Sequence, residues 1–313
     1  MLIPTNSLEI FKQNEYRQTE IGLVSNNAYL SIVATNNCQR ECFYCINSCT
    51  DKTLELPIDK AKVNIKKLVD KYGIKEAVIL GGEPLLHSDI IELCDAVKRA
   101  GIKRLYLTTN GIVLAKDDDA LIAELSAYLT GINISYHNEN FITFTKLQQI
   151  YRRFHDNGVK VRVNTNIWRG NHDTFKEFLD FIRMLTRDSF MQVCDEVRVS
   201  NLIFKDSFSV NTKNNVLSRE KILSDAEYEN LFNKYLAFEG GNHAIFVNHE
   251  TLGFVRYYLV PSPVPVIVNW NLNSKVAEQV CENDMAHRKI NTFKCLVNGE
   301  ISLSWNTNNI IEL

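Results

Sequence analysis

The stretch YLSIVATNNCQRECFYC, residues 29–45, joins a strand-like run to a loop that holds three cysteines. Residues 29–35 are rich in β-branched and apolar side chains, as buried strands are, and Cys38, Cys42 and Cys45 follow closely. In barrels and in open α/β sheets alike, active sites are built at the carboxyl ends of the strands. Thiolates at such spacing can bind zinc or an iron–sulfur cluster. The stretch therefore predicts a metal or redox site at the edge of a sheet.

The rest of the chain suggests a reducing compartment. Its 313 residues include eight cysteines, and its start lacks the charged and apolar segments of a signal peptide. Disulfides belong mainly to oxidising compartments, so we expect a cytoplasmic protein whose clustered cysteines serve metal or redox chemistry. Cys94 and Cys194 lie in a helical and a strand-like context and are expected to be buried structural thiols.

Charge and hydropathy exclude several kinds of partner. The charged residues nearly cancel, leaving a net charge of −2, so no basic field points to nucleic acid or to an anionic membrane. No run approaches the roughly 20 apolar residues that a membrane span requires. We therefore expect a small-molecule partner, with neither nucleic acid nor membrane.

From residue 29 onward, short β-branched runs alternate with amphipathic helical stretches, which is typical of parallel βαβ units. The stretches at about 57–72 and 173–186 place their apolar residues on one face, as helices outside a sheet do. Six such units could form part of a barrel or an open doubly wound sheet, so their number alone does not decide. The predicted strands are 29–35, 76–82, 103–110, 131–137, 160–167 and 196–204.

After the sixth predicted strand the regular alternation of strand-like and helical stretches ends. Ser224 and Glu227 have the spacing of a capping box and predict a helix that ends near residue 238. Asn298-Gly299 predicts a hairpin turn near the end of the chain. We therefore divide the chain into an N-terminal extension (1–28), a partial barrel (29–204) and a smaller α+β appendage (205–313), with strand-like runs at 244–249, 253–259 and 264–272.

The cysteine loop resembles the signature of a known enzyme family. The spacing C-x3-C-x2-C after the first strand, with Tyr44 before the last cysteine, is similar to the motif of radical S-adenosylmethionine (radical SAM) enzymes. In that family three cysteines hold a [4Fe–4S] cluster, and the methionine moiety of S-adenosylmethionine binds the fourth iron. The resemblance implies that Cys38, Cys42 and Cys45 are the ligands, that Cys49 is a bystander, and that the fold is an α/β partial (β/α)6 barrel.

Gly81-Gly82-Glu83-Pro84, at the end of the second predicted strand, is similar to the second signature of the family. That segment contacts the amino group of the methionine moiety. Paired glycines let a ligand approach the backbone, and a carboxylate can accept hydrogen bonds from an ammonium group. The resemblance therefore implies that these four residues bind the cofactor.

Polar residues on the next three strands are similar to those of the family branch that contains the GTP cyclase of molybdenum-cofactor biosynthesis. There, a TTNG segment, a serine and a basic residue help to hold S-adenosylmethionine. Hydroxyls and amides can bond ribose oxygens, and a guanidinium can bind the methionine carboxylate. The matching positions are Thr108, Thr109, Asn110, Ser135 and Arg162, with Asn164 and Asn201 as weaker candidates.

Beyond residue 204 the resemblance ends. Many family members bind auxiliary clusters in their C-terminal part, but Cys281 and Cys295 are too few to hold one without other ligands. Each is either a buried thiol or a donor of a hydrogen atom to a substrate radical, and such a donor would favour a redox-neutral epimerisation. Loose candidates for the substrate side are Tyr257, Tyr258, Asn269, Trp270 and His287.

The resemblance implies an enzyme in which a reduced cluster cleaves S-adenosylmethionine to a 5′-deoxyadenosyl radical that removes hydrogen from a substrate. A reductant such as flavodoxin or ferredoxin would supply the electron. The short segment before the cysteine loop favours a small molecule, a nucleoside or a sugar over a peptide or protein substrate. Two readings of another class stay open: a ferredoxin-like electron-transfer protein that uses Cys49 as a fourth ligand, and a zinc-stabilised binding module.

Overall fold

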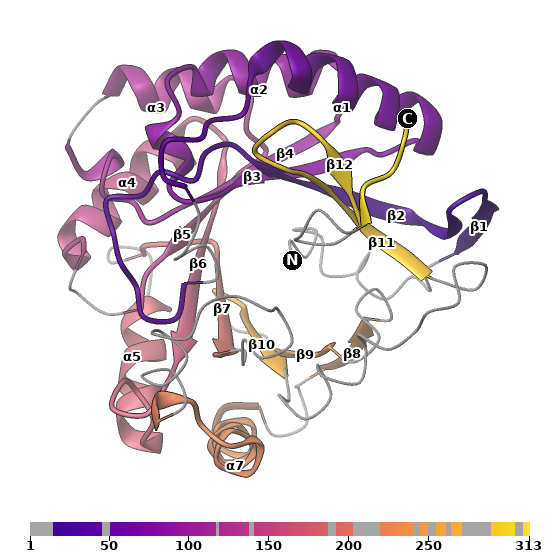
Figure 1. Ribbon diagram of the computed structural model, residues 1–313. Helices are drawn as coiled ribbons and strands as arrows, with labels where there is room; N and C mark the ends of the chain where they lie inside the picture. The colour runs from indigo at the N-terminus through magenta and orange to yellow at the C-terminus, as the bar shows by residue number, and fades with distance from the viewer. Residues whose placement is uncertain are drawn as a thin grey trace.

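The computed structural model shows an α/β architecture in which one curved sheet carries helices on its outer side (Figure 1). None of the described helices is long and apolar enough to cross a membrane. The side chains of residues 239–240, 245–249, 255–260 and 269–270 are not described. The structure describes residues 15–45, 51–116, 119–137, 141–186, 192–202, 220–240, 245–249, 255–260, 264–270, 289–303 and 309–313.

Six strands that pair in parallel and in chain order form the centre of the sheet. They confirm the alternation read from the sequence, with small shifts at most ends. The first strand begins at Gly22 rather than near residue 29, because a short antiparallel partner, β1 (Tyr16–Thr19), pairs with its start. The six are β2 (Gly22–Val33), β3 (Glu76–Leu80), β4 (Arg104–Thr109), β5 (Gly131–Ser135), β6 (Lys160–Ile167) and β7 (Glu196–Asn201).

The helices that connect these strands bury one apolar stripe each against the outer face of the sheet. Local signals set their ends: Thr143 and Thr174 cap two helices by accepting a backbone N–H, and Gly73 ends α1 in the left-handed conformation. The helices are α1 (Ile58–Tyr72), α2 (Ile90–Arg99), α3 (Asp119–Ser126), α4 (Phe144–Asp156) and α5 (Phe175–Leu185), with 3-10 turns at Pro84–Leu86 and Leu114–Lys116.

The C-terminal part extends the same sheet at both of its edges. β10 (Val266–Trp270) pairs in parallel with β7, and β9 (Val255–Val260) and β8 (Ile245–His249) continue antiparallel from it. At the other edge β11 (Lys289–Cys295) pairs in parallel with β2. The strand order is therefore β12-β11-β2-β3-β4-β5-β6-β7-β10-β9-β8.

Two C-terminal features match the sequence signals. α7 (Asp225–Tyr235) begins with the predicted capping box of Ser224 and Glu227, and a π-helical turn (Leu236–Gly240) follows. β12 (Ile301–Ser302) pairs antiparallel with β11 around the predicted Asn298-Gly299 turn. The division at residue 205 stays a prediction, since the described strands beyond it belong to the same sheet as the strands before it.

The two faces of the sheet differ in polarity. Side chains that alternate toward the helices are apolar, whereas the inner, concave face carries buried polar groups such as Glu76, Asn133, Arg162 and Glu196. Because the central strands are parallel, their carboxyl ends lie along one edge. The cysteine loop follows β2 at that edge.

Candidate functional site

The cysteine loop is held to its neighbours by backbone and hydroxyl contacts. The buried Thr35 hydroxyl donates to the Leu54 carbonyl over 3.0 Å and accepts from the Asn37 N–H over 3.0 Å. The Cys45 N–H donates to the Cys42 carbonyl over 3.0 Å, which closes a tight turn between these two thiols. These contacts fix where the loop leaves β2 and how its second half turns.

The three thiols lie half-buried on this one loop. Burial raises the pKa of Cys38, and the charges of Glu83, Cys45 and Cys42 act in the same direction, so these groups are near enough to interact. In the described part of the chain, no three cysteine, histidine or carboxylate side chains converge on a point that would hold one metal ion. A [4Fe–4S] cluster needs a different arrangement, in which each thiolate reaches a separate iron atom.

The paired glycines of the GGEP segment lie directly beneath this loop. A Cβ atom on Gly81, whose φ is +150°, would lie 2.3 Å from the Thr35 carbonyl oxygen, and one on Gly82 would lie 2.2 Å from that of Asn37. The Gly82 N–H donates to Thr35 over 2.6 Å, and the Glu83 N–H donates to Asn37 over 2.7 Å. The glycines therefore admit the cysteine loop, and their expected contact with the cofactor stays a prediction.

Glu83 joins this segment to the TTNG segment. Its carboxylate is 1% exposed and accepts from the Thr109 hydroxyl over 2.6 Å and from the Asn110 N–H over 2.8 Å. It also caps the Pro84–Leu86 turn through the Leu85 N–H, and burial raises its pKa. Glu83 therefore binds donors of the chain and fixes two strand ends to each other, and its expected contact with an ammonium group stays a prediction.

Of the three TTNG candidates, Asn110 lies nearest to the thiols. Its amide Nδ2 is 4.0 Å from the Cys38 sulfur, and its Oδ1 accepts from Gln39 of the same loop over 3.5 Å. The Thr109 hydroxyl donates to the Glu83 carboxylate, and the Thr108 hydroxyl accepts from the Asn133 amide over 3.1 Å on the inner face. The segment thus contacts the cysteine loop directly.

Ser135 and Asn164 lie side by side on the inner face, near the carboxyl ends of β5 and β6. They are opposite each other in the strand register, and Arg198 of β7 is opposite Asn164. The Asn164 Oδ1 atom is buried and has no hydrogen-bond partner among the described residues. Arg198 was not among the predicted residues, although it stands in the strand-like run EVRVSNLIF; its charge favours the ionised forms of Glu196 and Tyr29.

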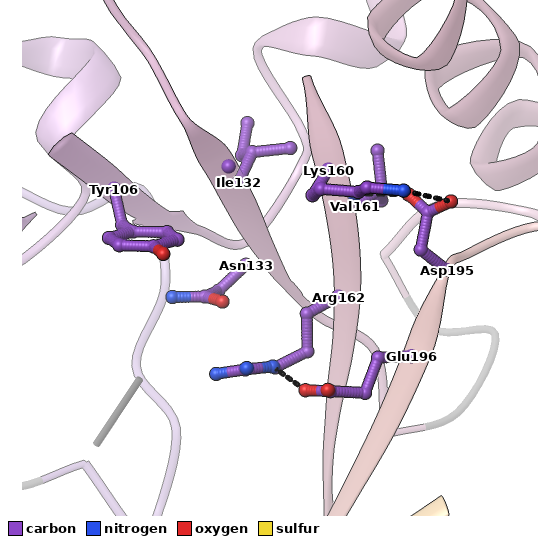
Figure 2. A pocket seen from close by; sticks show the side chains of 9 residues that line it. Tyr106, Ile132, Asn133, Lys160, Val161, Arg162, Asp195 and Glu196 are labelled. Carbon is purple, nitrogen blue, oxygen red and sulfur yellow. Dashed lines mark hydrogen bonds and ion pairs between the residues drawn. The ribbon is translucent and has the colours of Figure 1, made fainter. Parts of the chain in front are cut away.

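Arg162 lies deeper on the inner face, two residues before Asn164 along β6. Its Nε atom forms an ion pair with Glu196, and burial raises the pKa of that carboxyl while Arg162 opposes the shift. Figure 2 shows this pair in a small pocket near the start of β5, β6 and β7, with Tyr106 and Asn133 also on its wall. The structure therefore does not bring Arg162 together with the cysteine loop, and its expected role toward a carboxylate stays a prediction.

Four rings cluster at the turn between Cys42 and Cys45, and of these only Tyr44 was predicted; Phe43, His137 and Trp168 were not. Phe43 and Tyr44 lie edge to face at 5.0 Å between ring centroids. Trp168 is 5.6 Å from Phe43 and 5.3 Å from Tyr44, and His137 is 5.2 Å from Tyr44. The signal was in the sequence, because His137 ends the fourth predicted strand and Trp168 directly follows the fifth.

The other predicted residues lie away from this edge or outside the described residues. Cys295 is fully buried on the helix side of the sheet, in the apolar core, and burial raises its pKa to about 12, so it does not reach the inner face. The Asn201 amide donates to the Leu223 carbonyl over 3.3 Å. Outside the described residues or side chains are Cys49, Tyr257, Tyr258, Asn269, Trp270, Cys281 and His287.

Comparison with known proteins relates this edge to one family. A family model described as "Radical SAM superfamily" matches residues 32–185, which include the cysteine loop, the GGEP segment and the inner-face residues of β5 and β6. A probable GTP 3′,8-cyclase of Methanocaldococcus jannaschii is 32% identical over 142 residues, 44% of this chain and 46% of that protein. The GTP 3′,8-cyclase of Listeria monocytogenes is 31% identical over 181 residues, 53% of this chain and 52% of that protein. The chain thus spans about half the length of these relatives.

A solved structure supports the fold over a longer stretch. Streptococcus suis SuiB bound to S-adenosylmethionine matches with a TM-score of 0.58 at 15% identity and covers 91% of this chain and 63% of SuiB. SuiB bound to its precursor peptide SuiA matches with a TM-score of 0.56. At this identity the likeness concerns the fold alone.

Proposed function

Because the chain belongs to the radical SAM superfamily, we propose that it is an enzyme that cleaves S-adenosylmethionine reductively and removes a hydrogen atom from a substrate. The substrate we propose is a small molecule, a nucleoside or a sugar, and the outcome is an epimerisation, a rearrangement or a dehydrogenation. The sequence match to GTP 3′,8-cyclases supports a small substrate. We do not propose the substrate of these relatives for this chain, because the match covers only about half of each protein.

The residues fit the two groups that the superfamily implies, a [4Fe–4S] cluster and S-adenosylmethionine. Cys38, Cys42 and Cys45 offer three half-buried thiols on one loop, and cysteine thiolates are the usual ligands of such clusters. The buried Oδ1 of Asn164, which has no partner within the described chain, suits a donor of the bound nucleotide.

When bound, the cluster and S-adenosylmethionine would supply a 5′-deoxyadenosyl radical that can remove an unactivated hydrogen atom. The side chains of the protein would bind and orient these two groups and would exclude water from them. Ser135 and Asn164 would hold polar groups of the nucleotide from the inner face, while Tyr44 and Trp168 cover the thiol-bearing turn with aromatic surface. We propose that the segment 205–313, which adds strands at both edges, closes the substrate side.

The observation that best supports the proposal is the set of three half-buried thiols on the loop that follows β2, at the carboxyl edge of the parallel strands. The test is anaerobic incubation of reconstituted protein with S-adenosylmethionine and dithionite, with 5′-deoxyadenosine measured by chromatography. We expect the nucleoside from wild type and none from Cys45→Ser. Flavodoxin or ferredoxin should replace dithionite as the reductant.

Three other results would contradict the proposal. A wild-type protein that carries a full cluster but releases no 5′-deoxyadenosine with any of many candidate substrates would refute the activity. Loss of the cluster in Cys49→Ser would indicate a ferredoxin-like protein with four ligands; Cys49 is outside the described residues. A colourless protein that holds zinc and neither iron nor acid-labile sulfide would indicate a binding module.

A peptide- or protein-modifying enzyme is the second candidate. The likeness to SuiB extends over the C-terminal strands, which the match to the family model does not reach. A panel that compares small metabolites, nucleosides and sugars with cysteine-containing peptides would separate the two. Acceleration of 5′-deoxyadenosine formation by peptides alone would favour the second candidate.

A further inference from the structure

The two residues between Cys42 and Cys45 are both aromatic, and both rings are held from outside the cysteine loop. Phe43 and Tyr44 contact each other and Trp168, and Tyr44 also contacts His137. Because the Cys45 N–H donates to the Cys42 carbonyl, these rings sit on a closed turn that carries a thiol at each end. Whatever fixes the rings therefore also fixes the directions of the two thiols.

His137 is itself held in one orientation. Its Nδ1 atom accepts from the backbone N–H of Asn166 over 3.0 Å. An imidazole that accepts at Nδ1 is neutral and carries its proton on Nε2, since the imidazolium form has no acceptor. The ring is buried, and its edge lies against Tyr44 at an interplanar angle of 88°.

Trp168 opens a short turn, which we call the β6 corner (residues 168–171), and this turn is rigid. Trp168 and Asn171 exchange both backbone hydrogen bonds, and Gly170 supplies the left-handed conformation with a φ of +85°. The Asn171 amide donates to the His137 carbonyl over 3.3 Å. His137 and the β6 corner therefore form one unit.

The β6 corner is also tied to the C-terminal part of the chain. The Arg169 N–H donates to the Lys221 carbonyl over 2.7 Å, and its guanidinium binds both carboxylate oxygens of Glu227 at 2.8 Å. Glu227 belongs to the capping box that starts α7. The Lys221 ammonium lies 4.8 Å from the centre of the Phe43 ring, so the same turn is supported from a second side.

We propose that Trp168 and His137 are positioning residues of the active site, which hold the Phe43–Tyr44 ring pair and thereby orient Cys42 and Cys45. This inference rests on the proposed function insofar as those thiols bind a cluster. Neither side chain needs to touch substrate. Their effect passes through the turn that joins the two thiols.

The test compares variants of Trp168 and His137. The His137 variants remove either its aromatic ring or its hydrogen bond with the Asn166 N–H, so that the two contributions can be measured separately. Trp168→Leu removes the aromatic face and Trp168→Phe keeps one. His137→Asn keeps an acceptor for the Asn166 N–H but removes the ring, whereas His137→Phe does the reverse. A matched control, Phe293→Leu, removes a buried ring that stacks on Tyr72 at 5.1 Å on the helix side of the sheet.

Two measurements do not depend on turnover. In the protein without a cluster, alkylation of Cys42 and Cys45 by iodoacetamide should be about three- to tenfold faster in Trp168→Leu and in His137→Asn, because the turn that buries them opens more often. In the reconstituted and reduced protein, the electron paramagnetic resonance spectrum and midpoint potential should change in these two variants. Trp168→Phe should restore wild-type behaviour.

Turnover gives a third readout. KM for S-adenosylmethionine should rise by about fivefold or more in Trp168→Leu, with a smaller effect on kcat, since lost ring contacts amount to roughly that factor. Wild-type alkylation rates, spectra and KM in Trp168→Leu and His137→Asn would overturn the inference, as would changes no larger than those of Phe293→Leu. A wild-type protein that binds no cluster would overturn the proposed function and this inference together.

Discussion

Replacing Gly82 by alanine should detach the cysteine loop from the sheet. The added Cβ would lie 2.2 Å from the Asn37 carbonyl oxygen and 2.6 Å from that of Asn36, and real Cβ contacts are essentially never below 3.0 Å. The loop must therefore move by at least about 0.8 Å, the difference between 3.0 Å and 2.2 Å. Such a shift can stretch the bonds from Gly82 to Thr35 and from Glu83 to Asn37, now 2.6 and 2.7 Å long, to the limit of a hydrogen bond. At about 1 kcal/mol each, their weakening lowers the free energy of unfolding by at most about 2 kcal/mol.

Urea unfolding and iron analysis after anaerobic reconstitution measure the two consequences. We expect Gly82→Ala to unfold at a lower urea concentration and to lose most of its iron. Gly158→Ala is the matched control, because that glycine has a φ of +76° but nothing within 4 Å of the added carbon. It should lose about 1 kcal/mol through backbone strain and keep its iron. Wild-type stability and iron content in Gly82→Ala would refute the contact between loop and glycine on which this reasoning rests.

Three other changes have expected outcomes. Cys45→Ser should remove nearly all acid-labile sulfide, while Cys94→Ser, which alters a thiol buried under α2, should leave it unchanged in the same assay. Asn164→Ala should raise KM for S-adenosylmethionine about three- to tenfold, with little loss of thermal stability, because the deleted oxygen has no partner in the described chain. Glu227→Gln should cost about 1 kcal/mol at pH 7 by weakening the helix cap and the pair with Arg169. Because the pKa of Glu227 is lowered from 4.5 to about 2 in the folded state, that difference should be complete above pH 4.5 and vanish in melts taken as the pH falls toward 2.

Local patterns were enough to predict the central strands and the start of α7. Each β-branched run buries apolar side chains against the helices, so its periodicity is visible in the sequence, and the box of Ser224 and Glu227 is a contact between near neighbours. The pairing of β11 with β2 could not be predicted in the same way. It joins residues 289–295 to residues 23–32, and the local sequence of neither strand indicates which strand it pairs with.

Motifs predicted a site at the carboxyl edge of the sheet, but they did not predict the contacts that Gly82 and Glu83 make within the chain. Gly82 and Glu83 have the features expected of ligand-binding residues, yet one makes room for the cysteine loop and the other binds Thr109 and Asn110. In the sequence, a glycine can indicate that another group approaches the backbone closely, and a carboxylate that hydrogen-bond donors lie near it. Neither residue type indicates whether that group belongs to a ligand or to the chain itself. Trp168 was missed because an aromatic residue at a strand end is usually part of the core.

The geometry of the site depends on residues well beyond the part of the chain that the family model matches. β2, which leads into the cysteine loop, has β3 on one side and β11 on the other, and the hairpin beyond β11 is fixed to α1 by a 2.8 Å bond from the Asn64 amide to the Gly299 carbonyl. β7 pairs on one side with β6, the strand that leads to Trp168, and on the other side with β10. Without these partners both strands would be open edges, which are prone to wrong pairing. The matched segment contains the three cysteines that we propose as ligands, and the C-terminal strands pair with β2 and β7, so both halves of the chain contribute to the sheet that carries the proposed site.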